Sequence, residues 1–245
     1  MIGRLVRRDD LDAAERAAMF ALLSSHFDGV EPRTFDRDLD EKNWVLLFTE
    51  GGALRGFTTL LVYDTSHAGE PVSVVYSGDT IMSREGWRTS ALPRSWIGAV
   101  RLLRETCLQP GSRLYWLLLT SGFRTYRLLP VFWREFYPRH DAATPVGTQD
   151  LMDALATERL GSCYDPGRGV VTFAAPQRLR GDLQDVSPGR LGDPHVAFFL
   201  SRNPGWLAGD ELLCLTEIDV DNLTPAGRRM WGSGPRAGIR EERAG

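Results

Sequence analysis

The chain has 245 residues, which is long enough to bury a sizeable core without disulfides or a structural metal. Its formal net charge of -3 at pH 7 gives no reason to expect nucleic acid as a partner. Cys107, Cys163 and Cys214 lie far apart and form no C-x-x-C pair, so we expect reduced thiols and no metal site.

The N-terminal stretch MIGRLVRRDDLDAAERAAMF turns acidic where a secretory signal peptide would be apolar. No run in the sequence reaches the roughly 18 apolar residues that a membrane span requires. We therefore expect a cytoplasmic protein that does not span a membrane.

The first third of the chain predicts a short strand, two helices and three antiparallel strands. GRLVR suits a strand, LDAAERAAMFALLSSHF has the spacing of an amphipathic helix capped by Asp9 or Asp10, and RTFDRDLDEKN suits a second helix. The apolar runs WVLLF, LRGFTTLLVYD and VSVVYSGDTIM are separated by the turn sequences EGG and SHAGEP. Residues 44–82 are therefore expected to form an antiparallel meander.

A helix, a strand and another helix follow. WIGAVRLLRETCL places its apolar residues on one helical face. RLYWLLLTS is typical of a buried strand, which we expect to run parallel to the third meander strand and to diverge from it. GFRTYRLLPVFWREFYP suits a helix that is interrupted or restarts at Pro130.

The C-terminal part is richer in Gly, Pro and Asp. Helices are expected in TQDLMDALATERL and DPHVAFFLSRNPGWL, and strands in GVVTFAA and DELLCLTEIDVDNL. We expect one domain over residues 1–231, with a core at 1–140 and an elaboration at 141–231, followed by a disordered tail at 232–245.

The stretch YSGDTIMSREGWRTSALPRSW, residues 76–96, joins the third meander strand to the next helix. A helix N-terminus after a glycine-containing loop offers unpaired N–H groups and a positive dipole end, which suit a phosphate. Ser90 is the expected cap, Arg88 and Arg94 add charge, and Pro93 removes one donor. The alternative is an ordinary loop between a strand and a helix.

The order of elements over roughly residues 1–140 resembles the GNAT acyltransferase superfamily. The resemblance implies an α/β fold with a mixed, mostly antiparallel central sheet flanked by helices. It also implies that the join binds acyl-CoA or the acyl-phosphopantetheine of an acyl carrier protein. The family signature Q/R-x-x-G-x-G/A is replaced here by GWRTSAL. The donor-binding residues that follow from the resemblance are Gly78, Gly86, Trp87, Arg88, Thr89, Ser90, Ala91 and Arg94.

The same resemblance suggests the catalytic groups. Gly78 stands where a bulge in the strand would turn an N–H group towards a thioester carbonyl. Asp79 is the candidate base for the amine, and Tyr76 or Tyr126 the candidate proton donor to the departing thiolate. Two structural alternatives stay open: Asp79 caps a turn with Thr80, and both tyrosines are core residues.

An aromatic run and one histidine are the remaining candidates. The run SGFRTYRLLPVFWREFYPRH either fills the core or lines an apolar tunnel for an acyl group longer than acetyl, together with Trp87, Trp96 and Trp116. His195 stands near two phenylalanines, which favours a structural role over that of a base.

The leading interpretation is an N-acyltransferase that acts on a small-molecule or peptide amine. One alternative is a sensor that binds an acyl thioester or a lipid without turnover. Another is an enzyme similar to autoinducer synthases. RTFDRDLDEKNW has the Arg, Phe and Trp of that branch, but at different spacing, so no residue is carried over from it.

Overall fold

The computed structural model of the protein describes residues 1–233, apart from the side chains of Arg88, Asp182 and Pro188. The tail expected at 232–245 lies outside these residues from position 234 onward. Within the described range, one sheet contains eight strands. Their order across the sheet is β1 (Ile2–Arg7), β3 (Trp44–Glu50), β4 (Ala53–His67), β5 (Glu70–Met82), β6 (Arg113–Thr120), β10 (Glu211–Glu217), β8 (Val170–Val171) and β7 (Tyr164–Asp165).

The sheet has the mixed, mostly antiparallel topology that was predicted. β3, β4 and β5 form the antiparallel meander over residues 44–82. β5 pairs with β6 in parallel, whereas the neighbouring pairs β4 with β5 and β6 with β10 are antiparallel. The expected parallel strand at residues 113–120 is therefore confirmed, and the fold class with it.

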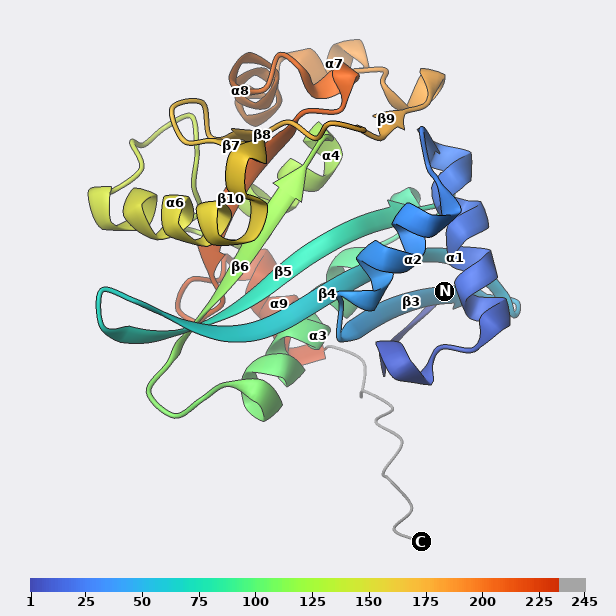
Figure 1. The fold of residues 1–245 in the computed structure, drawn as a ribbon, viewed down its shortest axis with the longest axis horizontal. Helices are drawn as coiled ribbons and strands as arrows, with labels where there is room; N and C mark the ends of the chain where they lie inside the picture. The colour runs from blue at the N-terminus through green and yellow to red at the C-terminus, as the bar shows by residue number, and fades with distance from the viewer. Residues whose placement is uncertain (234–245) are drawn as a thin grey trace, which may run out of the picture.

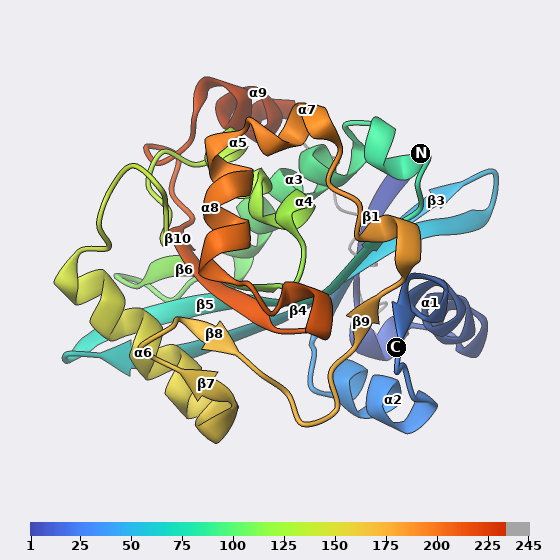
Figure 2. The same ribbon diagram turned by 90° about the horizontal axis from the view of Figure 1, so that it is seen from above.

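Helices cover both faces of the sheet (Figures 1 and 2). The face that carries the site is covered by α1 (Ala13–His26), α2 (Pro32–Asp40) and α6 (Val146–Leu160). The opposite face is covered by α3 (Ala91–Cys107), α4 (Phe123–Tyr126), α5 (Leu128–Phe132), α8 (Pro194–Arg202) and α9 (Pro225–Ser233). A short helix α7 (Pro188–Leu191) precedes α8. On their shared face, α2 packs with β3 and β4, whereas α6 packs with β5, β6 and β10, so the two helices cover different parts of the sheet.

Two local details differ from the sequence prediction. Asp12 rather than Asp9 or Asp10 caps α1, because its carboxylate accepts the Glu15 N–H at 2.7 Å while the Glu15 carboxylate accepts the Asp12 N–H. The helix after β6 is interrupted at Arg127, and Pro130 lies in the first turn of α5. Proline is tolerated there because its missing N–H would have no partner in the helix.

The C-terminal elaboration is part of the same sheet. β10 pairs with β6 from Leu212 opposite Thr120 to Glu217 opposite Tyr115. A separate two-stranded sheet joins β2 (Phe27–Asp28), directly after α1, to β9 (Arg178–Leu179). The predicted strand GVVTFAA is only two residues long, and α9 was not predicted. The C-terminal half therefore supplies β10, β8 and β7 to the central sheet.

Candidate active site

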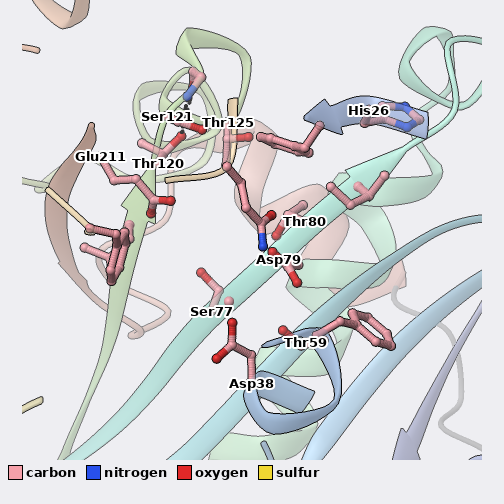
Figure 3. A pocket seen from close by; sticks show the side chains of 18 of the residues that line it. His26, Asp38, Thr59, Ser77, Asp79, Thr80, Thr120, Ser121, Thr125 and Glu211 are labelled. Atoms are coloured by element: carbon pink, nitrogen blue, oxygen red, sulfur yellow. Dashed lines mark hydrogen bonds between the residues drawn. The ribbon is translucent and has the colours of Figure 1, made fainter. Parts of the chain in front are cut away.

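The site lies where β5 and β6 separate. The two strands pair from Val72 opposite Arg113 to Ser77 opposite Leu118, after which β5 continues to Met82 and β6 ends at Thr120. A cavity of about 880 Å³ opens at this divergence, between α2 and α6. Figure 3 labels some of its polar residues, among them Asp38, Asp79 and Glu211.

A bulge occurs at the point of divergence. Thr58 lies opposite Thr80 and Leu60 opposite Ser77, so Gly78 and Asp79 together face the single residue Thr59. This is the two-against-one count of a β-bulge, and it confirms the bulge predicted at Gly78. The extra residue shifts the alternation of side chains, so Asp79 faces the cavity.

Asp79 is a partly buried carboxyl group that no polar group neutralises directly. Among residues 1–233 it has neither a hydrogen bond nor an ion pair, and Thr80 bonds to Thr58 at 2.8 Å instead. Asp79 therefore does not cap a turn with Thr80. Burial raises the pKa of Asp79 to about 6, Lys42 acts in the opposite direction, and Asp38 adds to the rise. Such a carboxylate can accept a proton near neutral pH.

Lys42, which the sequence analysis did not single out, is the only lysine in the chain and lines the cavity. Its exposure is 7%. The Nζ atom donates to the backbone oxygen of Asp38 at 2.9 Å and lies 5.5 Å from the ring centre of Tyr76. Burial and the nearby Arg159 lower the pKa of Lys42. A signal was present in the sequence, since a lone lysine among arginines is unusual.

Tyr76 is buried at the cavity wall, as the catalytic prediction requires. The guanidinium of Arg159, from α6, stands 4.3 Å from its ring centre and contacts Glu41, the residue that follows α2, at 3.0 Å. Burial, and to a smaller extent Glu211, raise the pKa of Tyr76 above its ordinary value. The phenol is therefore protonated at neutral pH.

Tyr126 does not reach the cavity. It is fully buried, its hydroxyl donates to the backbone oxygen of Pro138 at 2.9 Å, and its ring packs against Phe198 and Phe199. Its hydroxyl proton is thus already used in the core, and the prediction of Tyr126 as a proton donor is corrected. The rest of the aromatic run behaves similarly, because its buried members, like Trp96 and Trp116, belong to the core beneath α3 rather than to the cavity wall.

Only some of the predicted donor-binding residues line the cavity. Gly78 and Trp87 line the cavity. Gly86 is buried, and a β-carbon there would overlap the Sδ atom of Met82. Thr89, Ser90 and Arg94 are exposed at the start of α3, next to the partly buried Ala91, and they lie outside the cavity lining. The side chain of Arg88 lies outside the described residues.

The start of α3 is capped differently from the prediction. Ser90 occupies the N-cap position without a side-chain hydrogen bond. Instead, Thr89 Oγ1 accepts the N–H of Ala91 at 3.2 Å and donates to the oxygen of Gly86 at 2.9 Å. One of the N–H groups expected to bind an anion is therefore already used.

Two arginines line the cavity close to the join, namely Arg84 and Arg124. The guanidinium of Arg124 donates to the backbone oxygens of Leu183 and Asp185, at 2.6 and 3.1 Å. Burial lowers the pKa of Arg124, and the positive charges of Arg190 and Arg84 contribute to the fall. Positive charge thus gathers at this end of the cavity.

Residues 174–187, called the strap here, form one wall of the cavity. β9 lies within the strap and pairs with β2. The N–H of Arg180 donates to the oxygen of His26 at 2.8 Å, and its guanidinium lies 2.8 Å from Asp28. Leu179 and Leu183 of the strap line the cavity. These contacts tie the C-terminal half to the end of α1.

Glu211, the first residue of β10, is a second carboxyl group in the cavity that the sequence analysis missed. Burial raises its pKa to about 8, and the negative charges of Asp79 and Asp38 contribute to the rise. By contrast, His195 lies outside the cavity lining. Its ring is 4.5 Å from that of His140, and burial and then His140 lower its pKa. His195 is therefore not a base at this site.

The described part of the chain was also searched for metal clusters and for membrane-spanning helices. Over residues 1–233, no cluster of His, Cys, Asp and Glu side chains could hold a metal ion. Within the same range, no helix has both the length and the apolar character needed to cross a membrane.

No protein-family model and no curated protein sequence matches this chain. Solved structures with a similar arrangement include a probable N-acyltransferase of Enterococcus faecalis, with 13% identity over 56% of this chain and 33% of that chain, at a TM-score of 0.41. An acetyltransferase of Trypanosoma brucei has 14% identity over 59% of this chain and 98% of its own, at 0.38. An acyl-CoA N-acyltransferase of Pseudomonas aeruginosa has 17% identity over 47% and 77%, at 0.34. Likenesses of this size do not assign an activity to the chain.

Proposed function

We propose that this chain is a GNAT-like N-acyltransferase that moves an acyl group from a thioester donor to an amine by direct attack. The carrying observation is the separation of β5 from β6 at Gly78, where a bulge, the unpaired carboxyl group of Asp79 and a cavity of about 880 Å³ coincide. A parallel pair that opens in this way leaves backbone N–H groups without a neighbouring strand. Such groups can polarise a carbonyl.

The donor is proposed to enter beside the join, where Arg84 and Arg124 line the cavity next to Trp87. Cationic side chains there favour a phosphate-bearing donor. The N-terminus of α3, at Ala91, adds its dipole. Acyl-CoA and the acyl-phosphopantetheine of an acyl carrier protein share this chemistry, so both remain donors in the proposal.

The proposed reaction forms one C–N bond and breaks one C–S bond. The amine nitrogen attacks the thioester carbonyl carbon, and a backbone N–H at the bulge stabilises the developing oxyanion. Asp79 takes the proton that the amine loses, and the departing sulfur receives a proton from Tyr76 or from water. A base with a pKa of about 6 and a phenol held in its protonated form suit these roles.

An acyl group longer than acetyl is part of the proposal. The support is the size of the cavity, about 880 Å³, and its apolar wall, which includes Phe35, Leu119 and Phe173. The acceptor is a small-molecule or peptide amine, which would approach Asp79 from the side of α2 and α6.

The test offers the purified protein a series of acyl-CoA and acyl-pantetheine thioesters with a panel of primary amines, between pH 6 and about 9. We expect amide products in the mass spectrum and an equal amount of free thiol, both dependent on the amine. If calorimetry detects thioester binding while no amine is acylated, a sensor replaces the enzyme.

A further inference from the structure

Glu211 stands on the far side of the strand divergence from Asp79. The next residue along β10, Leu212, pairs with Thr120, so Glu211 lies beyond the end of β6. Figure 3 shows the carboxyl groups of Glu211 and Asp79 on opposite sides of the same cavity. One carboxyl group therefore comes from β5 and another from the start of β10, on the two sides of the divergence.

The backbone of Glu211 pairs with Val171 of β8, but its carboxyl group forms neither a hydrogen bond nor an ion pair with the side chains described over residues 1–233. Two of the cations that line the same cavity are engaged with other groups. Arg159 contacts Glu41 at 3.0 Å, and Lys42 donates to the backbone of Asp38 at 2.9 Å. A partly buried carboxylate without a partner is unfavourable, and an added cation would offset that cost.

The groups that face Glu211 make a bound cation more favourable still. Asp79 approaches it from β5 and Asp38 from α2, and the negative charge of each raises the pKa of Glu211. Because its pKa is about 8, Glu211 binds a proton over much of the neutral range when no cation is present. A ligand cation would displace that proton.

We infer that Glu211 binds a second cationic group of the acceptor, whose reacting amine lies at Asp79. The acceptor class is thus a diamine or longer polyamine, with two amino groups spaced to reach both carboxyl groups. This inference rests on the proposed function, because it assigns Asp79 to the reacting amine. Glu211 is a specificity-determining residue that takes no part in bond making.

The experiment compares α,ω-diamines with monoamines of the same number of non-hydrogen atoms, for example 1,5-diaminopentane with n-hexylamine, over a series of lengths. For the wild type, kcat/KM should favour the diamine by about 10-fold or more at one length, as expected for a charge-assisted contact. In Glu211→Gln this ratio should fall to about 1. Glu158→Gln removes the same charge from an exposed position on α6 outside the cavity lining, and it should keep the ratio.

A binding measurement without donor separates this inference from the proposed function. Calorimetry of 1,5-diaminopentane in two buffers of different ionisation enthalpy should show proton release by the wild type at pH 7.5, and none by Glu211→Gln. Equal kcat/KM values for diamines and monoamines at every length would overturn the inference while leaving the acyltransferase intact. Diamine binding with proton release, but with no transfer to any amine, would overturn the acyltransferase alone. Melting curves establish that each variant is folded.

Discussion

Gly78 lies directly beneath Lys42, so that a β-carbon on Gly78 would stand 2.8 Å from Cε of Lys42 and 2.6 Å from Oγ1 of Thr59. The space that another residue at position 78 would need is thus filled by the buried lysine and by the strand opposite the bulge. Any larger residue at position 78 would have to displace the side chains of Lys42 and Thr59.

Gly78→Ala should therefore destabilise the protein by about 1 to 3 kcal/mol, the usual range for overpacking, and reduce turnover by displacing the bulge. Chemical denaturation measures the first effect. Gly147→Ala is the matched control, because nothing lies within 4 Å of a β-carbon at Gly147, in the first turn of α6. A neutral Gly78→Ala would show that the bulge adapts to a side chain.

Lys42→Met tests whether the buried ammonium keeps Asp79 ionised. Lys42 is the main charge that opposes the rise in the pKa of Asp79, so its removal should raise that pKa above about 6. The acid limb of the kcat/KM profile should then move to higher pH. Arg33→Met, which removes an exposed charge from α2 outside the cavity lining, should leave the limb in place. An unmoved limb in Lys42→Met would mean that another group titrates.

The ionised carboxylate of Asp79 should lower the free energy of unfolding at high pH. Its folded pKa of about 6 lies above the ordinary value of 3.8, so the folded state holds the proton more tightly than the unfolded state. The stability that this group contributes is present below about pH 4 and is lost as the pH rises through about 6. Asp79→Asn should thus be more stable than the wild type at pH 8, by about 1 to 3 kcal/mol, and little different at pH 4. Urea unfolding at both pH values, with Asp36→Asn as an exposed control, decides this.

Removing the hydroxyl group should affect mainly stability at Tyr126 and mainly turnover at Tyr76. Tyr126→Phe loses the hydrogen bond to Pro138 and should cost about 1 kcal/mol of stability while turnover is kept. Tyr76→Phe keeps the ring beneath Arg159 but removes the proposed proton donor, so turnover should fall by about 10-fold or more. Full activity in Tyr76→Phe would assign that proton transfer to water.

Local pattern was sufficient for much of the central sheet. Turn sequences and apolar runs predicted the strands of residues 44–82, and Gly78 correctly indicated the bulge, because these features depend on neighbours in sequence. Tyr126 was assigned wrongly because an aromatic residue in a dense aromatic run gives no indication of which face meets the cavity.

The missed residues come from segments that meet only in the folded chain. Glu211 enters the cavity because β10 pairs with β6, and no local pattern reveals that pairing. The strap is held by a two-residue strand and by single contacts such as Arg180 with Asp28, which leave no periodic signal. Lys42 was visible in the sequence, but its burial depends on α2 packing over the bulge.

The most direct test of the account is turnover by Asp79→Asn, measured beside donor affinity. The amide keeps the size of the side chain but cannot take a proton, so kcat should fall by about 100-fold or more while the Kd for the acyl thioester stays nearly unchanged. The variant is expected to be at least as stable as the wild type at pH 8, so unfolding would not explain the loss. A turnover rate equal to that of the wild type would contradict the assignment of Asp79 as the base.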